Sequence, residues 1–121
     1  MAFQPVISAK TTDTPTNIFE VIEGRVPLRV TFASGQTITK GMAVAEISAS
    51  HKYGEYDNSG SGGLEVCKGI ADDDVDASSG DQIGFIWIHG TMIYANLTGV
   101  DSAAVTDLGI KKFLNDTIYS F

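Results

Sequence analysis

The chain has 121 residues, of which 43% are hydrophobic and 19% are charged, and its formal net charge is −7. This length fits one domain, and this composition excludes an intrinsically disordered chain. Because an acidic surface repels phosphate and the eight Lys and Arg residues are scattered along the chain, we expect no nucleic-acid partner.

Residues 1–17 differ in composition from the rest of the chain. Pro5 and Pro15 disfavour both a helix and a central strand, and the Thr-rich stretch over residues 11–17 has little apolar surface to bury. We therefore predict a flexible, extended N-terminal arm over residues 1–17, followed by a β-rich domain over residues 18–121.

The arm nevertheless carries apolar residues that a fully solvated tail does not need. We predict that it orders on a partner protein by adding a strand to a sheet edge. The candidate contact residues are Phe3, Pro5, Val6 and Ile7. The first ten residues lack an apolar segment behind a basic start, and no stretch approaches about 18 apolar residues, so we expect no signal peptide, no membrane partner and a cytoplasm-like compartment.

The first strand of the domain is predicted from strict alternation over residues 26–32. Polar or small residues alternate there with four apolar residues that share one face, which is typical of a half-buried strand. The apolar residues are Val26, Leu28, Val30 and Phe32. Because Pro27 has no N–H to donate, we place this strand at a sheet edge or place Pro27 at the start of the strand.

Further strands are predicted from apolar runs separated by turn residues. Residues 83–88 are apolar on both faces, which predicts a central strand buried on both sides. The other strand-like segments cover residues 42–47, 64–70 and 110–121. Between them, residues 50–63 are predicted as a glycine-rich loop and residues 72–81 as a polar turn.

One helix is predicted, over residues 102–108. Asp101 is a suitable N-cap, Gly109 stands where a helix-ending glycine belongs, and Val105 and Leu108 form an apolar side. Together these elements predict a mainly β fold: a small compact domain of β-barrel or β-clip type with one short helix and an extended N-terminal arm.

No motif for catalysis or metal binding is complete. An EF-hand loop that starts at Asp72 needs Gly at its sixth place and Glu at its twelfth, but Ala77 and Ile83 stand there. We therefore interpret the acidic run over residues 72–76 as a solvated, capped turn. The two histidines, His51 and His89, lie in no nucleophile motif.

The remaining candidate groups are also interpreted as structural. The single cysteine, Cys67, forms neither a disulfide nor a thiolate metal site within one chain, and we expect it to be a buried apolar residue. The glycine-rich residues 60–63 lack the Lys-Ser/Thr of a phosphate-binding loop. We therefore predict that the protein is not an enzyme and has no catalytic, cofactor-binding or metal-binding residues.

Two alternative functions stay open on the sequence. The segment TKGMAVAEI (residues 39–47), followed by Lys52, is similar to a biotinyl or lipoyl carrier domain, which implies a modified lysine, although the residues around Lys52 differ from both carrier motifs. A virion surface module that binds glycans or a receptor is the other alternative. It would use exposed aromatic residues, of which the candidates are Trp87, Tyr53, Tyr56 and Tyr94.

A more extensive resemblance covers residues 38–113. The ordered segments are KGMAVAEI (40–47), SASHKY (48–53), YD (56–57), EVCKGIA (65–71), DVDA (74–77), GD (80–81), IWIHG (86–90) and LGI (108–110). In this order the sequence resembles the lambda-type head decoration proteins of tailed bacteriophages. Cys67 stands where such sequences often have Ala, which is a small apolar exchange.

The resemblance implies a compact β-rich homotrimer on the outer surface of a capsid. It implies that each trimer sits at a three-fold or quasi-three-fold position, binds neighbouring copies of the major capsid protein and stabilises the expanded shell against internal DNA pressure. It also implies an N-terminal arm that orders on the capsid, in agreement with the interpretation of residues 1–17. The low charged fraction of the chain is consistent with a surface that is partly covered by partners.

Overall fold

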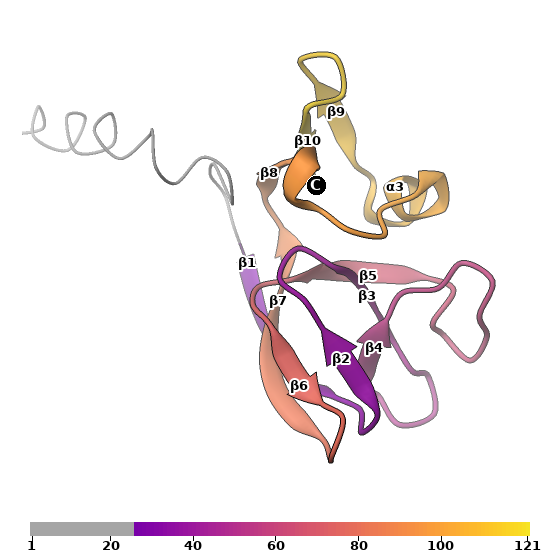
Figure 1. Ribbon diagram of the computed structural model, residues 1–121. Coiled ribbons are helices and arrows are strands. Elements are labelled where there is room, and N and C mark those ends of the chain that lie inside the picture. Colours follow the sequence, from indigo (N-terminus) through magenta and orange to yellow (C-terminus); the bar gives the residue numbers. More distant parts are fainter. Residues whose placement is uncertain (1–25) are drawn as a thin grey trace, which may run out of the picture.

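The computed structural model describes residues 26–121, which form a mainly β domain with one α-helix (Figure 1). The predicted arm, with Phe3, Pro5, Val6 and Ile7, lies outside the described residues. The elements in chain order are β1 (Val26–Phe32), β2 (Gln36–Ile38), β3 (Ala43–Glu46), β4 (Tyr53–Glu55), β5 (Cys67–Ala71), β6 (Val75–Ala77), β7 (Gln82–His89), β8 (Thr91–Ile93), the 3₁₀ turn η1 (Tyr94–Asn96), α3 (Ser102–Leu108), β9 (Lys111–Phe113) and β10 (Ile118–Ser120).

Five strands close into a barrel in the order β1-β4-β3-β5-β7, which confirms the predicted fold class. Side chains that alternate along these strands point inward and form the first core. This core contains Val30, Phe32, Ile38, Met42, Val44, Ala71, Ala77 and Ile86. A two-stranded sheet of β2 and β6 lies beside the barrel and contributes Ile38 and Ala77 to this core.

A second layer covers part of the outer wall of the barrel. The three-stranded sheet β8-β10-β9 and the helix α3 form this layer, which stands above the barrel in Figure 1. The second core lies between them and the outward side chains of the wall, and Trp87 packs at its border. Its buried members are Ala43, Ala45, Tyr56, Cys67, Ile70, Met92, Val100, Ala104 and Tyr119.

Helix α3 confirms the prediction at both ends. The side chain of Asp101 accepts a hydrogen bond from the N–H of Ala104 at 2.9 Å, and Gly109 adopts the left-handed conformation with φ 66°. Ala104 is the buried residue of the helix, and Val105 and Leu108 pack against the second core. Such a short helix depends on this packing, because two turns are marginal in isolation.

The predicted alternation of β1 is present, but only half of its apolar face is buried. Val30 and Phe32 lie in the barrel core, whereas Val26 and Leu28 are exposed. Pro27 stands at a register shift near the start of β1, as expected for a residue without an N–H. On the side away from β7, the described residues pair with β1 only at Phe32, which lies opposite Tyr53 of β4.

For β7, the prediction of a central strand is confirmed and the prediction of burial on both faces is wrong. β7 pairs with β1 on one side and β5 on the other. Its inward residue Ile86 is fully buried, but Ile83 and Phe85, which alternate with it and therefore point outward, are 55% and 46% exposed. The second layer reaches Trp87 and leaves the first half of the strand uncovered among the described residues.

Several short strands fall within segments that were predicted as loops or turns. β4 lies in the predicted loop over residues 50–63, and β6 lies in the predicted turn over residues 72–81. The segment over residues 110–121 is a hairpin of β9 and β10 rather than one strand. Strands of three residues carry no readable period, so they depend on the partner strands that pair with them.

The turn before β3 requires glycine. Gly41 has φ 84°, and a Cβ atom at this position would lie 2.1 Å from the carbonyl oxygen of Asn96. Backbone hydrogen bonds join Gly41 to Ala71 and to Thr98, so neither neighbouring segment is free to move away.

We predict that Gly41→Ala destabilises the domain by about 3 kcal/mol and lowers its melting temperature by about 10 °C, because the substitution combines strain at positive φ with a backbone clash. Thermal unfolding followed by circular dichroism measures the change. Gly80→Ala is the matched control, since a Cβ atom at Gly80 meets nothing within 4 Å. Equal melting temperatures for the two variants would contradict the prediction.

Candidate protein-interaction surface

Two acidic residues of the run over residues 72–76 serve as caps. Asp74 accepts a hydrogen bond from the N–H of Lys40 at 2.8 Å, and Asp76 accepts from both the N–H and the hydroxyl of Ser78. These bonds match the predicted capped turn, and those from Ser78 lower the pKa of Asp76. Within residues 26–121, no group of three or more His, Cys, Asp or Glu side chains is arranged to hold a metal ion.

Neither histidine is placed beside a nucleophile. His51 adopts a positive φ of 61°, and its Nδ1 atom lies 3.1 Å from the Oε2 atom of Glu46 at the protein surface. His89 is the last residue of β7, where it pairs with Val26. The single thiol, Cys67, is buried in the second core, and its Sγ atom contacts the carbonyl oxygen of Gly69.

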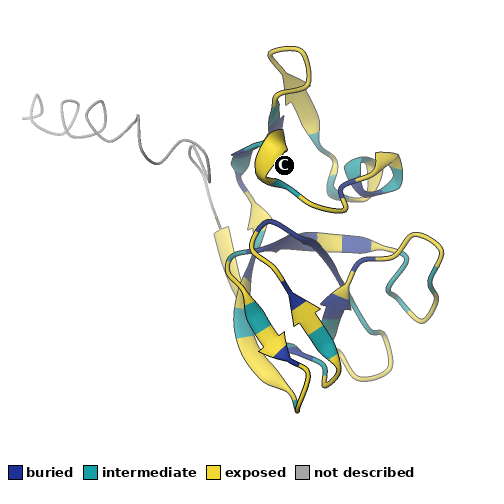
Figure 2. Ribbon diagram, viewed as in Figure 1, coloured by how far each residue is buried: buried dark blue, intermediate teal, exposed yellow. Residues whose placement is uncertain are grey.

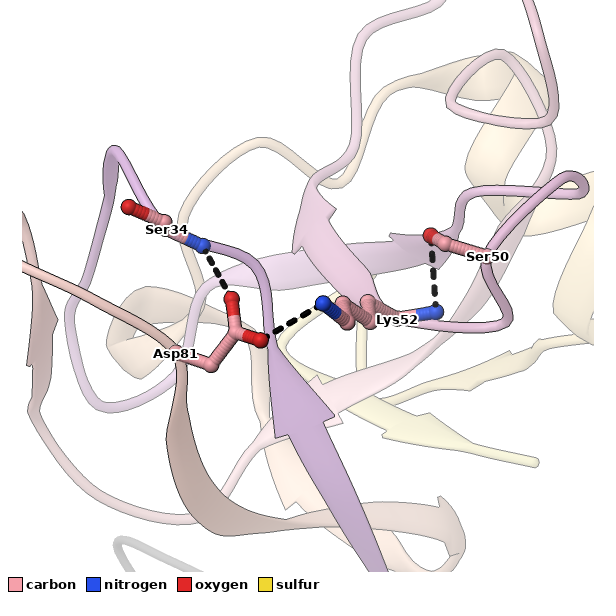
Figure 3. Close-up of polar contacts among 4 residues, drawn as sticks. All are labelled: Ser34, Ser50, Lys52 and Asp81. Atoms are coloured by element: carbon pink, nitrogen blue, oxygen red, sulfur yellow. Dashed lines mark hydrogen bonds and ion pairs between the residues drawn. The ribbon is translucent and has the colours of Figure 1, made fainter.

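Lys52, the candidate for carrier modification, forms an ion pair at the start of β4. Its Nζ atom lies 2.6 Å from Oδ2 of Asp81, and Oδ1 of the same carboxylate accepts the N–H of Ser34 (Figure 3). Ser50 accepts the N–H of Lys52. The contacts from Lys52 and Ser34 lower the pKa of Asp81, and they join three loops at this end of the barrel.

The aromatic residues proposed for glycan binding do not form one exposed platform. Tyr56 is buried and donates its hydroxyl hydrogen bond to Asp101, and Trp87 packs against the second core. The ring of Tyr94 stacks on Tyr119 at 4.5 Å between centroids. Tyr94 and Tyr56 do line a shared groove of about 600 Å³, together with Leu97, Val100 and acidic residues at its rim.

What distinguishes the described surface is exposed apolar area. Figure 2 shows exposed residues along β1, β7 and β9. The exposed large hydrophobic residues are Val26, Leu28, Val66, Ile83, Phe85, Ile88, Tyr94, Phe113 and Leu114. Five of them lie on the paired strands β1 and β7, and we call this set the β1–β7 surface: Leu28 and Ile88 on the side of Ile86, Ile83 and Phe85 on the outer side, and Val26 at the register shift.

Strand pairing places these residues on two sides of the same pair of strands: Leu28 lies opposite the inward Ile86, whereas Ile83 and Phe85 face outward. Val26 pairs with His89 at the register shift next to Ile88, so the exposed apolar residues begin where the N-terminal segment joins the barrel. A groove of about 360 Å³ runs along β1 on the side toward β4, and Leu28, Tyr53 and Ile83 are among its lining residues. Exposed apolar residues beside a strand edge that no described residue pairs with are typical of protein-binding surfaces.

Sequence reasoning placed the apolar residues of β1 and β7 correctly on strands but assigned them to the core. The signal was present: an apolar run on both faces of a strand indicates either burial on both sides or burial on one side and a partner on the other. Within one chain, only the folded arrangement distinguishes these two cases.

Comparison of the chain with protein-family models, with curated proteins and with solved structures gave no match. Among the described residues, no helix is long and apolar enough to cross a membrane.

Cys67 is predicted to be chemically inert in the folded protein. Burial raises the pKa of its thiol to about 12, from an ordinary value of 9.0. At pH 8 the folded protein should therefore hold about a thousandfold less thiolate than the unfolded chain, and native labelling by a thiol reagent should slow by at least that factor. Rapid labelling without denaturant would contradict this, and Cys67→Ala provides the unlabelled control.

Proposed function

We propose that this protein is a bacteriophage head decoration protein that binds the outer surface of the capsid as a homotrimer at three-fold and quasi-three-fold positions. It contacts the major capsid protein and stabilises the expanded shell against the pressure of packaged DNA. The observation that carries the proposal is the β1–β7 surface, a set of exposed apolar residues on both sides of two paired strands, next to the point where the N-terminal segment joins the barrel.

The resemblance in sequence supports this proposal independently. Its ordered segments fall on β3, on β5, on the β6 turn, on β7 and on the end of α3, so they account for much of the wall of the barrel and its covering layer. Among the groups that could carry chemistry, Cys67 is buried, Lys52 is paired with Asp81, and Asp74 and Asp76 act as caps. The acidic charge favours a position away from DNA, on the outside of the shell.

The stabilising effect follows from linkage. A ligand that binds the assembled shell but not its separated subunits shifts the equilibrium toward the shell by mass action. A trimer that binds several subunits at once gains effective concentration for its second and third contacts, so individual contacts need only moderate affinity. The protein would be made in the bacterial cytoplasm and would reach the virion after the shell expands, without a membrane partner.

Deletion of residues 1–17 is expected to leave a folded trimer that no longer binds capsids. The deletion removes none of the described residues of the two cores, which lie at or after Val30. It removes the apolar residues assigned to capsid contact. Light scattering measures the trimer, and co-sedimentation with expanded shells of the phage's own major capsid protein measures binding.

Two substitution variants make this test specific to the proposed contact residues. Replacing Phe3, Val6 and Ile7 by Ala is expected to weaken co-sedimentation as the deletion does. Replacing Thr11, Thr12 and Thr14 by Ala is the matched control, and it is expected to bind like the wild type. Undiminished binding by the truncated protein would overturn the role assigned to the arm.

A further inference from the structure

The four most exposed large apolar side chains of the described residues form two separate pairs. Leu114 is 74% exposed and Phe113 is 50% exposed, and they are neighbours at the turn between β9 and β10. Ile83 is 55% exposed and Phe85 is 46% exposed, and they are alternate residues on the outer side of β7. The first pair belongs to the covering layer and the second to the barrel (Figure 1).

The first pair forms a protruding tip, which we call the β9 tip (Lys111–Asp116). Leu114, Asn115 and Asp116 all have positive φ, between 52° and 66°, a conformation that is unfavourable for Leu. Thr117 holds the turn in place, because its hydroxyl donates a hydrogen bond to the carbonyl oxygen of Leu114 at 2.6 Å. The fold therefore fixes an apolar side chain in solvent at some conformational cost, which favours a role in binding.

The second pair lies on the outer side of β7. We call Ile83 and Phe85, together with their neighbours on the adjacent strands, the β7 patch. Strand pairing places Arg29 opposite Phe85 and Thr31 opposite Ile83 on the same outer side. On the other flank, the N–H of Asp72 donates to the carbonyl oxygen of Phe85 at 3.0 Å, which brings the acidic residues that begin there to the edge of the patch. Asp73 and Asp74 follow and are exposed.

Both surfaces are apolar at their centre, and the charges around them are opposite in sign. The β9 tip carries Lys111 and Lys112, the only adjacent basic pair in the chain, and both are exposed. The β7 patch is flanked by three consecutive Asp residues (72–74). Each surface also carries one residue of the opposite charge, Asp116 at the basic tip and Arg29 at the acidic patch, and these two charges are complementary as well. Opposite charges around apolar contacts fix the register of an interface and speed its formation.

From this complementarity we propose that the β9 tip of one copy binds the β7 patch of a second copy of this chain. The contact joins two different surfaces, so it is head-to-tail, and such contacts close into a ring when the rotation between copies permits. The inference rests on the proposed homotrimer and names the surfaces that build it, which leaves the N-terminal segment and the remainder of the β1–β7 surface to the capsid.

Two variants that each disable one surface test the proposal. Leu114→Asp replaces the apolar tip by a residue that tolerates positive φ and repels the acidic patch. Phe85→Lys removes the apolar centre of the patch and repels the basic tip. Each variant alone is expected to lose the trimer and to have the mass of a single 12.8 kDa chain in light scattering, at concentrations where the wild type is trimeric.

Mixing the two variants is the decisive measurement. The Leu114→Asp chain keeps an intact patch and the Phe85→Lys chain keeps an intact tip, so a 1:1 mixture contains one intact contact for each pair of chains. The mass of the mixture is expected to rise toward two chains with increasing concentration and to fall again at high salt. Val66→Asp, which changes an exposed apolar residue outside both surfaces, is the control and is expected to remain trimeric.

The outcomes separate this inference from the proposed function. Variants that keep the wild-type melting temperature and stay trimeric overturn the assigned interface, as does a mixture that stays monomeric at every concentration. A wild-type trimer that fails to co-sediment with expanded shells overturns the capsid function and leaves the interface in place. A wild type that is monomeric at every concentration overturns both the assigned interface and the proposed homotrimer.

Discussion

The fold depends on a barrel wall whose outward side chains are small enough for a second layer to pack closely against it. Ala43, Ala45 and Cys67 point outward from β3 and β5, and Ala104 of α3 meets them in the second core. Each of these residues is almost completely buried. Close packing of this kind gains dispersion and apolar burial without large side chains, but it tolerates little increase in volume.

Polar contacts fix the position of the covering layer on this wall. Asp101 accepts hydrogen bonds from the N–H of Ala104 and from the hydroxyl of Tyr56, so one carboxylate caps the helix and joins it to the segment after β4. Asp107 accepts the N–H of Cys67 from the other end of α3. Because buried polar groups are costly without partners, these contacts specify one orientation of the layer.

Covering one side of the barrel leaves the other side uncovered, and this asymmetry connects the fold to the proposed assembly. β1 has an unpaired edge and β7 has outward apolar residues because no described element of the chain reaches them. A second copy and a capsid would bury this area, and the free energy of that burial would then stabilise the trimer and the shell rather than the isolated domain. The same reasoning explains why the charged fraction of the chain is modest for a small acidic domain.

The sequence by itself determined the elements whose causes are local. The N-cap at Asp101 and the left-handed Gly109 set the bounds of α3, the alternation along β1 set its inward side, and Pro27 stands where a missing N–H is tolerated. Burial of Cys67 also followed from its place in an apolar run. Only the tertiary structure decided two short strands, β4, which pairs with both β3 and β1, and β6, which pairs with the distant β2, and it decided the exposure of Ile83 and Phe85. The physical reason is that a pattern of apolar residues states which side chains avoid water, whereas the folded arrangement decides whether this chain or a partner covers them.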